Sequence, residues 1–352
     1  MSQPILPRHP YKEQPDKAFW KKAVSDQYPL DIHDWYTKRF SLSNNTIATA
    51  GSCFAQHIGK QLRDKGFKFM DVEPAPAFLP KDSHHSYGYG MYSARYGNIY
   101  SSRQLLQLLQ RAYGEFEPQD NYWLKDGGYV DPFRPTIEPE PYVSITELLA
   151  HREHHFKCVR KLFEEAEIFV FTLGLTETWV SKADGSAFPI APGVAGGVYD
   201  PEKYQLLNLT CTDVIRDMVA FIRKVREINP KIRFLLTISP VPLMATATDK
   251  NVVVATMYSK SVLRAAAGFL ADKFRFVDYF PSYEIISSPI MRGQFYNPDM
   301  RTVAQYGVEH VMKQFFKQHQ PPKVIKAKSD RPTEQDNDDV VCDEELLAVF
   351  GA

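Results

Sequence analysis

The chain has 352 residues, of which 44% are hydrophobic and 24% are charged, with 42 basic and 42 acidic side chains. This composition excludes general disorder, and zero net charge offers no basic surface for nucleic acid or an anionic membrane. No apolar run reaches the ~18 residues of a membrane span and the first residues lack a secretory signal, so we expect a soluble cytoplasmic protein. The four cysteines are dispersed and form no zinc or disulfide pattern, and we expect no metal or other cofactor.

Residues 1–40 are rich in proline and aromatic residues and show no periodicity. We expect an ordered arm that wraps the domain, because Phe19, Trp20, Tyr28 and Trp35 are costly to leave in water. Beyond this arm, apolar runs typical of strands alternate with segments of helical periodicity. The expected strands are 45–50, 67–70, 168–174, 232–240 and 274–280, and the expected helices are 53–65, 102–113, 144–167, 206–228, 252–274 and 303–318.

Apolar strands that alternate with helices are typical of a parallel sheet with both faces covered. Right-handed crossovers between such strands predict a doubly wound α/β fold, a three-layer α/β/α sandwich, over residues 41–319. Residues 320–352 differ, because a charged linker without aromatic residues leads to a short amphipathic segment at 342–352. That segment either folds back onto its own domain or docks on a protein partner.

In an open parallel sheet, ligands bind beyond the carboxyl ends of the strands. The turn at Ser52 and Cys53 joins the first strand to the first helix, where helix N-terminal amides stabilise a thiolate or an oxyanion. His57 lies one helical turn beyond Cys53 on the same face, as expected of a base that activates a nucleophile. The structural alternative is that Ser52 caps the helix, Cys53 belongs to the core, and His57 bonds to nearby backbone.

The segment TAGSCFAQHIGKQL at 49–62 resembles the signature of the GSCFA family. Four further segments resemble its successive blocks, so that the resemblance covers roughly residues 40–318: MYSARYGNIYSSRQLLQLLQRAYG, FVFTLGLTETW, LLTISPVPL and FYNPDMRTVAQYGVEHVM. The family is similar in fold to the SGNH/GDSL hydrolases, so the resemblance implies an α/β/α sandwich with a parallel, flavodoxin-like sheet. Those enzymes are esterases, lipases and acyl transferases, many of them acting on acylated carbohydrates. The resemblance therefore implies a nucleophile directly after the first strand.

Alignment with the SGNH blocks does not decide which residue, Ser52 or Cys53, is the nucleophile. An ungapped match to Gly-Asp-Ser-Leu places Cys53 at the nucleophile, and a shift of one residue places Ser52 there, with Gly51 in place of the aspartate. The resemblance implies an oxyanion hole built from the Gly97 amide and from Thr176, which replaces an asparagine in the block that runs from Gly174 to Glu177.

The last SGNH block, Asp-x-x-His, is replaced here by Asp299, Met300, Arg301 and Thr302. Thr302 therefore occupies the place of the catalytic histidine. Loss of a triad base costs several powers of ten in rate. Either His57 acts as the base, or His310 does, or the chain no longer performs this chemistry.

We therefore expect an SGNH-like ester hydrolase or O-acyltransferase acting on a small-molecule or saccharide ester, such as an acylated polysaccharide or a cell-envelope intermediate. The alternative is an inactive SGNH-fold module that binds carbohydrate or a protein partner. The expected catalytic residues are Ser52, Cys53 and His57, and the expected oxyanion or substrate contacts are Gly51, Gly97, Thr176, Glu177 and Asp299. Residues Trp123, Asp131 and Arg134 are candidates for a substrate groove, whereas His151, His154 and His155 lack further metal ligands.

Overall fold

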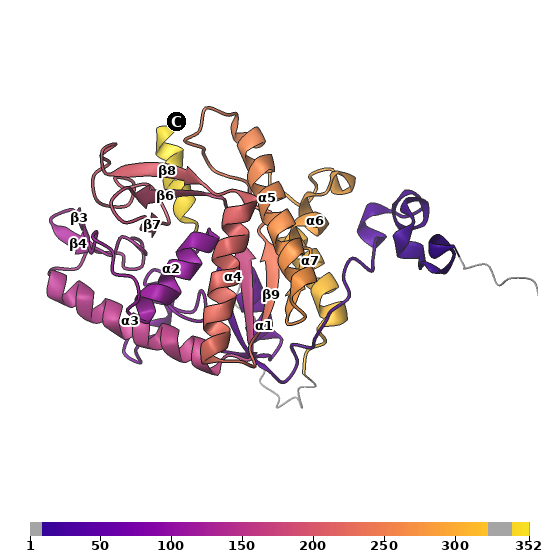
Figure 1. The fold of residues 1–352 in the computed structure, drawn as a ribbon, viewed down its shortest axis with the longest axis horizontal. Coiled ribbons are helices and arrows are strands. Elements are labelled where there is room, and N and C mark those ends of the chain that lie inside the picture. The colour runs from indigo at the N-terminus through magenta and orange to yellow at the C-terminus, as the bar shows by residue number, and fades with distance from the viewer. Residues whose placement is uncertain (1–8, 323–339, 352) are drawn as a thin grey trace, which may run out of the picture.

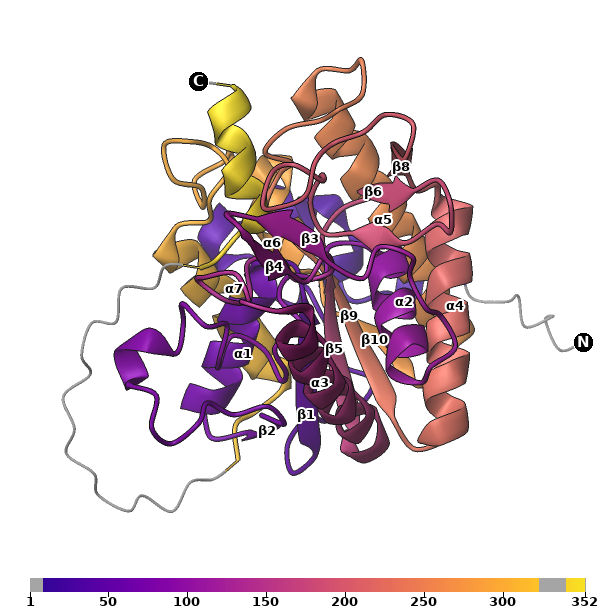
Figure 2. The same ribbon diagram turned by 90° about the vertical axis from the view of Figure 1, so that its left-hand side faces the viewer.

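The computed structural model describes residues 9–322 and 340–351 (Figures 1 and 2). A five-stranded parallel sheet lies at its centre, in the order β2-β1-β5-β9-β10. The strands are β1 (Thr46–Gly51), β2 (Lys68–Phe69), β5 (Ile168–Leu173), β9 (Arg233–Ile238) and β10 (Val277–Tyr279). This is the flavodoxin-like order, so the predicted fold class is confirmed.

Helices cover both faces of the sheet, which is why its strands are apolar on both sides. Residues Ile47, Val170 and Leu235 face one layer of helices, and Ala48, Phe171 and Leu236 face the other. The first layer consists of α1 (Phe54–Asp64), α6 (Ser282–Ser287) and α7 (Gln305–Gln318). The second consists of α2 (Ser102–Ala112), α3 (Ile145–Glu165), α4 (Cys211–Ile228) and α5 (Val252–Lys273). The molecule is therefore a three-layer sandwich (Figure 1).

Short strands lie outside the central sheet. A hairpin joins β3 (Trp123–Lys125) to β4 (Gly128–Val130), and an antiparallel sheet has the order β7-β6-β8, made of β6 (Glu177–Ser181), β7 (Ala187–Phe188) and β8 (Tyr204–Asn208). The helix expected at 206–228 is therefore wrong over its first residues. Pairing with β6 holds 204–208 extended, and α4 begins only after Thr210, whose side chain forms a capping box with Asp213.

Only the second half of the N-terminal arm packs on the domain. Ile32, Tyr36 and Leu42 are buried, whereas Trp20 is 70% exposed and Tyr28 is 64% exposed. In Figure 1 the short helices within 10–25 stand apart from the body, and η2 (Asp16–Ala18) packs on η3 (Lys21–Ser25). The expectation that Trp20 and Tyr28 are buried is wrong for this structure.

The C-terminal segment, residues 340–351, folds back onto its own chain. It contains the 3₁₀ helix η7 (Asp343–Phe350), which lies at the carboxyl edge of the sheet near β6 and β8 (Figures 1 and 2). Its first residues, Cys342, Asp343 and Glu344, are buried. Most of the expected charged linker falls on 323–339, outside the described residues.

Alanine in place of Gly51 is expected to destabilise the fold by at least about 3 kcal/mol, because two penalties combine at this position. Gly51 has φ +143°, and a Cβ there would lie 2.5 Å from the Thr172 carbonyl oxygen of the neighbouring strand. Gly114 is the matched control, since it has φ +70° with nothing within 4 Å, so that Gly114→Ala is expected to cost only about 1 kcal/mol. Urea unfolding of both variants measures the difference, and equal losses would show that the close approach is not costly.

Candidate active site

The turn after β1 separates the two candidate nucleophiles. The Ser52 amide donates to the Thr172 carbonyl at 3.1 Å, and the Ser52 hydroxyl is buried without a hydrogen-bond partner among the described residues. Cys53 lines a cavity of about 840 Å³ together with His57 and Thr302, whereas Ser52 lines only a narrow recess beside it. The cavity therefore favours Cys53 over Ser52 as the residue that a substrate can reach.

His57 lies on α1 at the wall of this cavity. Its ring packs edge-to-face on Phe54, with centroids 5.6 Å apart, and its side chain is half-buried. The other candidate base, His310, stacks on Phe295 at 4.9 Å and is not among the residues that line the cavity. The structure thus brings His57 and Cys53 to the same cavity.

The segment from Asp299 to Thr302 is a tight turn on the cavity wall. The Asp299 carboxylate accepts from the Arg301 amide at 2.9 Å, the Thr302 amide at 3.0 Å and the Thr302 hydroxyl at 2.8 Å. Burial tends to raise the pKa of Asp299, but these hydrogen bonds hold it below its usual value. Asp299 orients no histidine here, and instead shapes the turn that presents Arg301 and Thr302 to the cavity.

Gly174, which follows β5, allows close approach of the neighbouring segments. A Cβ at this position would lie 2.9 Å from the Ser52 Cβ. Its amide donates to the Tyr100 carbonyl at 2.9 Å, and its carbonyl accepts from the Lys260 ammonium at 2.7 Å. The backbone of Gly174 therefore connects the turn at Ser52 and Cys53, the end of β5 and α5.

Both hydrogen-bond donors of Thr176, its hydroxyl and its backbone amide, donate to other side chains of the domain. The hydroxyl donates to Asn208 Oδ1 at 2.7 Å, and the amide donates to Ser259 Oγ at 3.0 Å. The side chain is fully buried. In this structure Thr176 ties β8 and α5 to the strand end, and neither of its donors is directed at Cys53.

Near Gly97 it is the side chain of the next residue that reaches the site. Gly97 has φ +66°, and the following Asn98 is buried. The side-chain amide of Asn98 donates to the Val341 carbonyl at 3.1 Å and to the Asp343 carboxylate at 2.9 Å. The Tyr92 hydroxyl donates to Asn98 Oδ1 at 2.5 Å. Sequence reasoning missed Asn98, although its place directly after Gly97 in the same block was an available signal.

Lys260 is a second residue that sequence reasoning missed. Its side chain is fully buried on α5, beside Ser52, Cys53 and Glu344. Burial lowers the pKa of the ammonium group, and the negative charge of Glu344 opposes that shift. A lysine in an amphipathic helix is typical of a solvated face, so no local pattern signalled its position.

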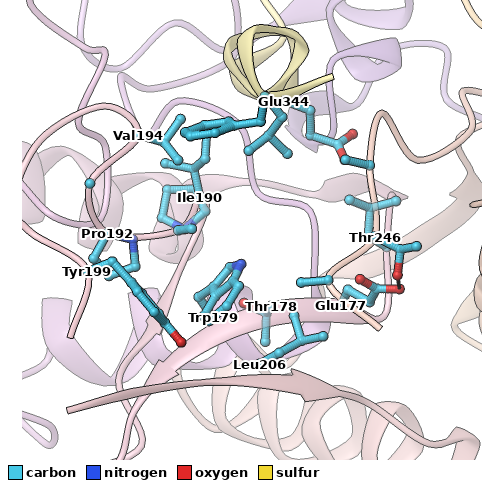
Figure 3. A pocket seen from close by; sticks show the side chains of 18 of the residues that line it. Glu177, Thr178, Trp179, Ile190, Pro192, Val194, Tyr199, Leu206, Thr246 and Glu344 are labelled. Carbon is cyan, nitrogen blue, oxygen red and sulfur yellow. Dashed lines mark hydrogen bonds between the residues drawn. The ribbon is translucent and has the colours of Figure 1, made fainter. Parts of the chain in front are cut away.

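Glu177 lies in a second cavity, of about 720 Å³, on the other side of η7 (Figure 3). Its carboxylate accepts from the Thr246 hydroxyl at 2.8 Å, and burial raises its pKa. The lining is mainly apolar and aromatic, with Trp179 and Tyr199 meeting edge-to-face at 5.4 Å. Glu344 borders both this cavity and the recess beside Ser52, so the cavity adjoins the turn at Ser52 and Cys53.

Trp123, Asp131 and Arg134 are buried and line neither large cavity. The Asp131 carboxylate accepts from Arg134 Nε at 3.1 Å and from Arg152 Nε at 3.2 Å, and Trp123 packs on Phe188. The expectation of a substrate groove at these residues is corrected. These residues form the interior of the insertion between α2 and β5. The buried charges of Asp131 and the two arginines are tolerated there because they are paired with one another.

Across the described ranges, no group of three or more His, Cys, Asp or Glu side chains is arranged to hold a metal ion. The buried His155 instead contacts Glu73, with Nδ1 and Oε2 2.7 Å apart. Over the same ranges, no helix combines the length and the hydropathy needed to cross a bilayer.

Comparison with known proteins places this geometry in a family. Among solved structures the chain is similar to that of an acetyl esterase mutant with an acetate ion, at 9% identity and a TM-score of 0.35, with 77% of this chain and 93% of that chain covered. None of the functionally curated proteins matches the sequence significantly. The GSCFA family model matches residues 46–315, a span that includes β1, the Ser52-Cys53 turn and the turn at Asp299. The chain that carries this parallel sheet and the turn at Ser52 and Cys53 therefore belongs to the GSCFA family.

Proposed function

We propose that the protein is an acyl-transfer enzyme, an ester hydrolase or an O-acyltransferase, with Cys53 as nucleophile and His57 as base. The observation that carries the proposal is the shared cavity, since Cys53 stands at the N-terminus of α1 and His57 lines the same wall one helical turn later. The helix N-terminus favours a thiolate and opposes the rise in the pKa of Cys53 that its contact with Cys342 and its burial cause. A nearby imidazole can accept the thiol proton. Membership of the GSCFA family supports a hydrolase-like activity.

In the reaction, His57 takes the proton from Cys53, and the sulfur attacks the acyl carbonyl carbon of the ester. The tetrahedral intermediate collapses to a thioester, and the alcohol leaves with the proton that His57 returns. Water, or a hydroxyl group of an acceptor, then attacks the thioester carbonyl and regenerates the thiol. The proposed donors to the oxyanion are the backbone amide of Gly97 and the side-chain amide of Asn98, the latter after its hydrogen bonds to Val341 and Asp343 in the C-terminal segment open. Gly51 and Gly174 allow the close packing of this edge.

The larger substrate group is proposed to occupy the cavity of about 720 Å³ that Trp179 and Tyr199 line. Aromatic faces pack well against sugar rings and acyl chains, and Glu177 with Thr246 provides a polar corner for hydroxyl groups. A saccharide ester, as found on acylated polysaccharides, suits both parts of this lining.

Covalent labelling tests the assignment. The full chain, reduced with a phosphine and desalted, is treated with an activated acyl ester and with a fluorophosphonate, and the labelled peptide is then mapped. We expect the label on Cys53, at least about tenfold less of it in His57→Ala, and unchanged labelling in the control His310→Ala, because general-base activation contributes about 10²- to 10⁴-fold. A label on Ser52, or no label above a denatured control, would overturn the proposal.

A second candidate function is a non-catalytic module that binds carbohydrate. Thr302 in place of the triad histidine and the engaged donors of Thr176 favour it. Titration with acetylated oligosaccharides would then quench tryptophan fluorescence without any ester cleavage, and Trp179→Phe would reduce the quenching. Ester cleavage that depends on Cys53 would exclude this candidate.

A further inference from the structure

The C-terminal segment, residues 340–351, is held by specific hydrogen bonds at the carboxyl edge of the sheet, next to Cys53. The Gln56 side chain pairs with the backbone of Val341, donating to its carbonyl at 2.8 Å and accepting from its amide at 3.3 Å. The Asp343 carboxylate accepts from Asn98 at 2.9 Å and from the Thr136 hydroxyl at 2.5 Å. Pairing of buried polar groups on both sides fixes the register of the segment against the domain.

This register places the Cys342 thiol beside the Cys53 thiol. The two side chains are close enough to interact, and both line the cavity of about 840 Å³. The Tyr100 hydroxyl lies 3.8 Å from Cys342 Sγ, and Arg301 Nη2 lies 3.5 Å from it. All four cysteines of the chain carry free thiols in this structure.

The surroundings of the two sulfurs make them chemically unequal. The hydrogen bond from Cys53, together with the charge of Arg301, lowers the pKa of Cys342 despite its burial. The same contact and burial raise the pKa of Cys53, and the negative charge of Glu344 adds to that effect. Cys342 therefore loses its proton first, and a thiolate next to a thiol is the pairing that peroxides oxidise readily.

The segment also closes the site physically. Cys53 is only 5% exposed, and Glu344 lies against Arg301 at 3.4 Å over the narrow recess that Ser52 and Lys260 line. Further along η7, Leu347 and Phe350 form part of the wall of the cavity of about 720 Å³. These contacts narrow the approach to Cys53, so that a substrate comes to it from the side of the cavity of about 840 Å³.

We propose that Cys53 and Cys342 form a reversible intramolecular disulfide, which locks the C-terminal segment over the nucleophile and switches the enzyme off under oxidising conditions. The bond depends only on the position of the two sulfurs. The switching of activity rests on the proposed function of Cys53.

The oxidant is hydrogen peroxide. The Cys342 thiolate attacks a peroxide oxygen, so that an S–O bond forms, the O–O bond breaks, and the departing hydroxide takes a proton to leave as water. The Cys53 sulfur then attacks the sulfenic sulfur of Cys342, forming the S–S bond while the S–O bond breaks, and the thiol proton leaves with the hydroxide as water. Two thiols and one peroxide thus give one disulfide and two waters, and an external thiol reverses the bond by exchange.

Treatment of the reduced full chain with one equivalent of hydrogen peroxide tests the bond. We expect an intact mass lower by two hydrogen atoms, a peptide joining Cys53 to Cys342 in a non-reducing digest, and Cys158 and Cys211 still open to alkylation after denaturation. The cross-link should disappear in Cys342→Ser and persist in the control Cys211→Ser. A folded chain in which Cys342 is oxidised to the sulfinic acid, or pairs with another cysteine, would overturn the proposal.

Activity assays separate this inference from the proposed function. In the wild type, ester hydrolysis should fall at least about tenfold as the cross-link forms and return after phosphine treatment. A cross-link in a chain that hydrolyses no ester in either redox state would support the bond and overturn the proposed function. Hydrolysis that depends on Cys53 without any cross-link would overturn the disulfide and leave the proposed function standing.

Discussion

Cys53→Ala is expected to lower the rate of ester hydrolysis by about 10³-fold or more, because removing the nucleophile of an acyl transferase leaves only binding and oxyanion stabilisation. Ser52→Ala is expected to stay within about fivefold of the wild type, since the Ser52 hydroxyl is buried and lines only the narrow recess. The measurement is kcat/KM for a short-chain activated ester with reduced protein.

The comparison of these two variants decides between the two candidate nucleophiles. Cys158→Ala serves as a control for the loss of a buried thiol, because Cys158 lies on α3, away from both large cavities. If Ser52→Ala lost activity while Cys53→Ala kept it, with both variants folded by circular dichroism, the nucleophile would be Ser52.

Asp131→Asn is expected to destabilise the fold by about 3–5 kcal/mol. The Asp131 carboxylate lies between Arg134 and Arg152, with exposed side-chain fractions of 2%, 3% and 8% respectively, and removing its charge leaves buried cations without compensation. Burial raises the pKa of Asp131, but the charges of Arg152, Arg134 and Arg111 outweigh that effect and hold the pKa well below 3.8. Urea unfolding measures the loss.

The sign of the pH dependence follows from this depressed pKa. A carboxyl group whose pKa is lower in the folded state contributes stability above its unfolded pKa of about 3.8, and the contribution is lost as pH falls toward the folded pKa. The gap between wild type and Asp131→Asn should therefore narrow as pH falls below about 4. Glu153→Gln, which removes an exposed ion pair with Arg160, is the matched control and is expected to cost less than about 1 kcal/mol. An Asp131→Asn variant as stable as this control would show that the buried arginines tolerate the missing charge.

The strands of the central sheet, and the helices that alternate with them along the chain, were predictable from the sequence. Residues 168–173 are apolar at every position except Thr172, which is typical of a strand covered on both faces, and segments such as 252–274 have the period of helices. Both signals are local, since they depend on residues a few positions apart. The turn at Ser52 and Cys53 could be recognised for the same reason, because strand, turn and helix follow one another directly.

The small strands were not predictable in this way. Two or three residues, as in β3, β4 and β7, are too few to show a period, and residues 204–208 are extended only because β6 lies beside them. The same limit applies to Lys260 and Asp131. Their burial depends on partners far away in the chain, Gly174 for the first and Arg152 for the second.

The proposed preference for Cys53 over Ser52, and the position of Cys342, rest on the tertiary structure. Adjacent residues at a turn differ in which side chain meets a cavity, and the cavity is built by α1, the turn at Asp299 and the C-terminal segment together. Cys342 lies 289 positions beyond Cys53, so no local pattern relates them. A sequence specifies local conformation through short-range sterics and periodicity, whereas the meeting of two distant thiols depends on how the whole chain packs.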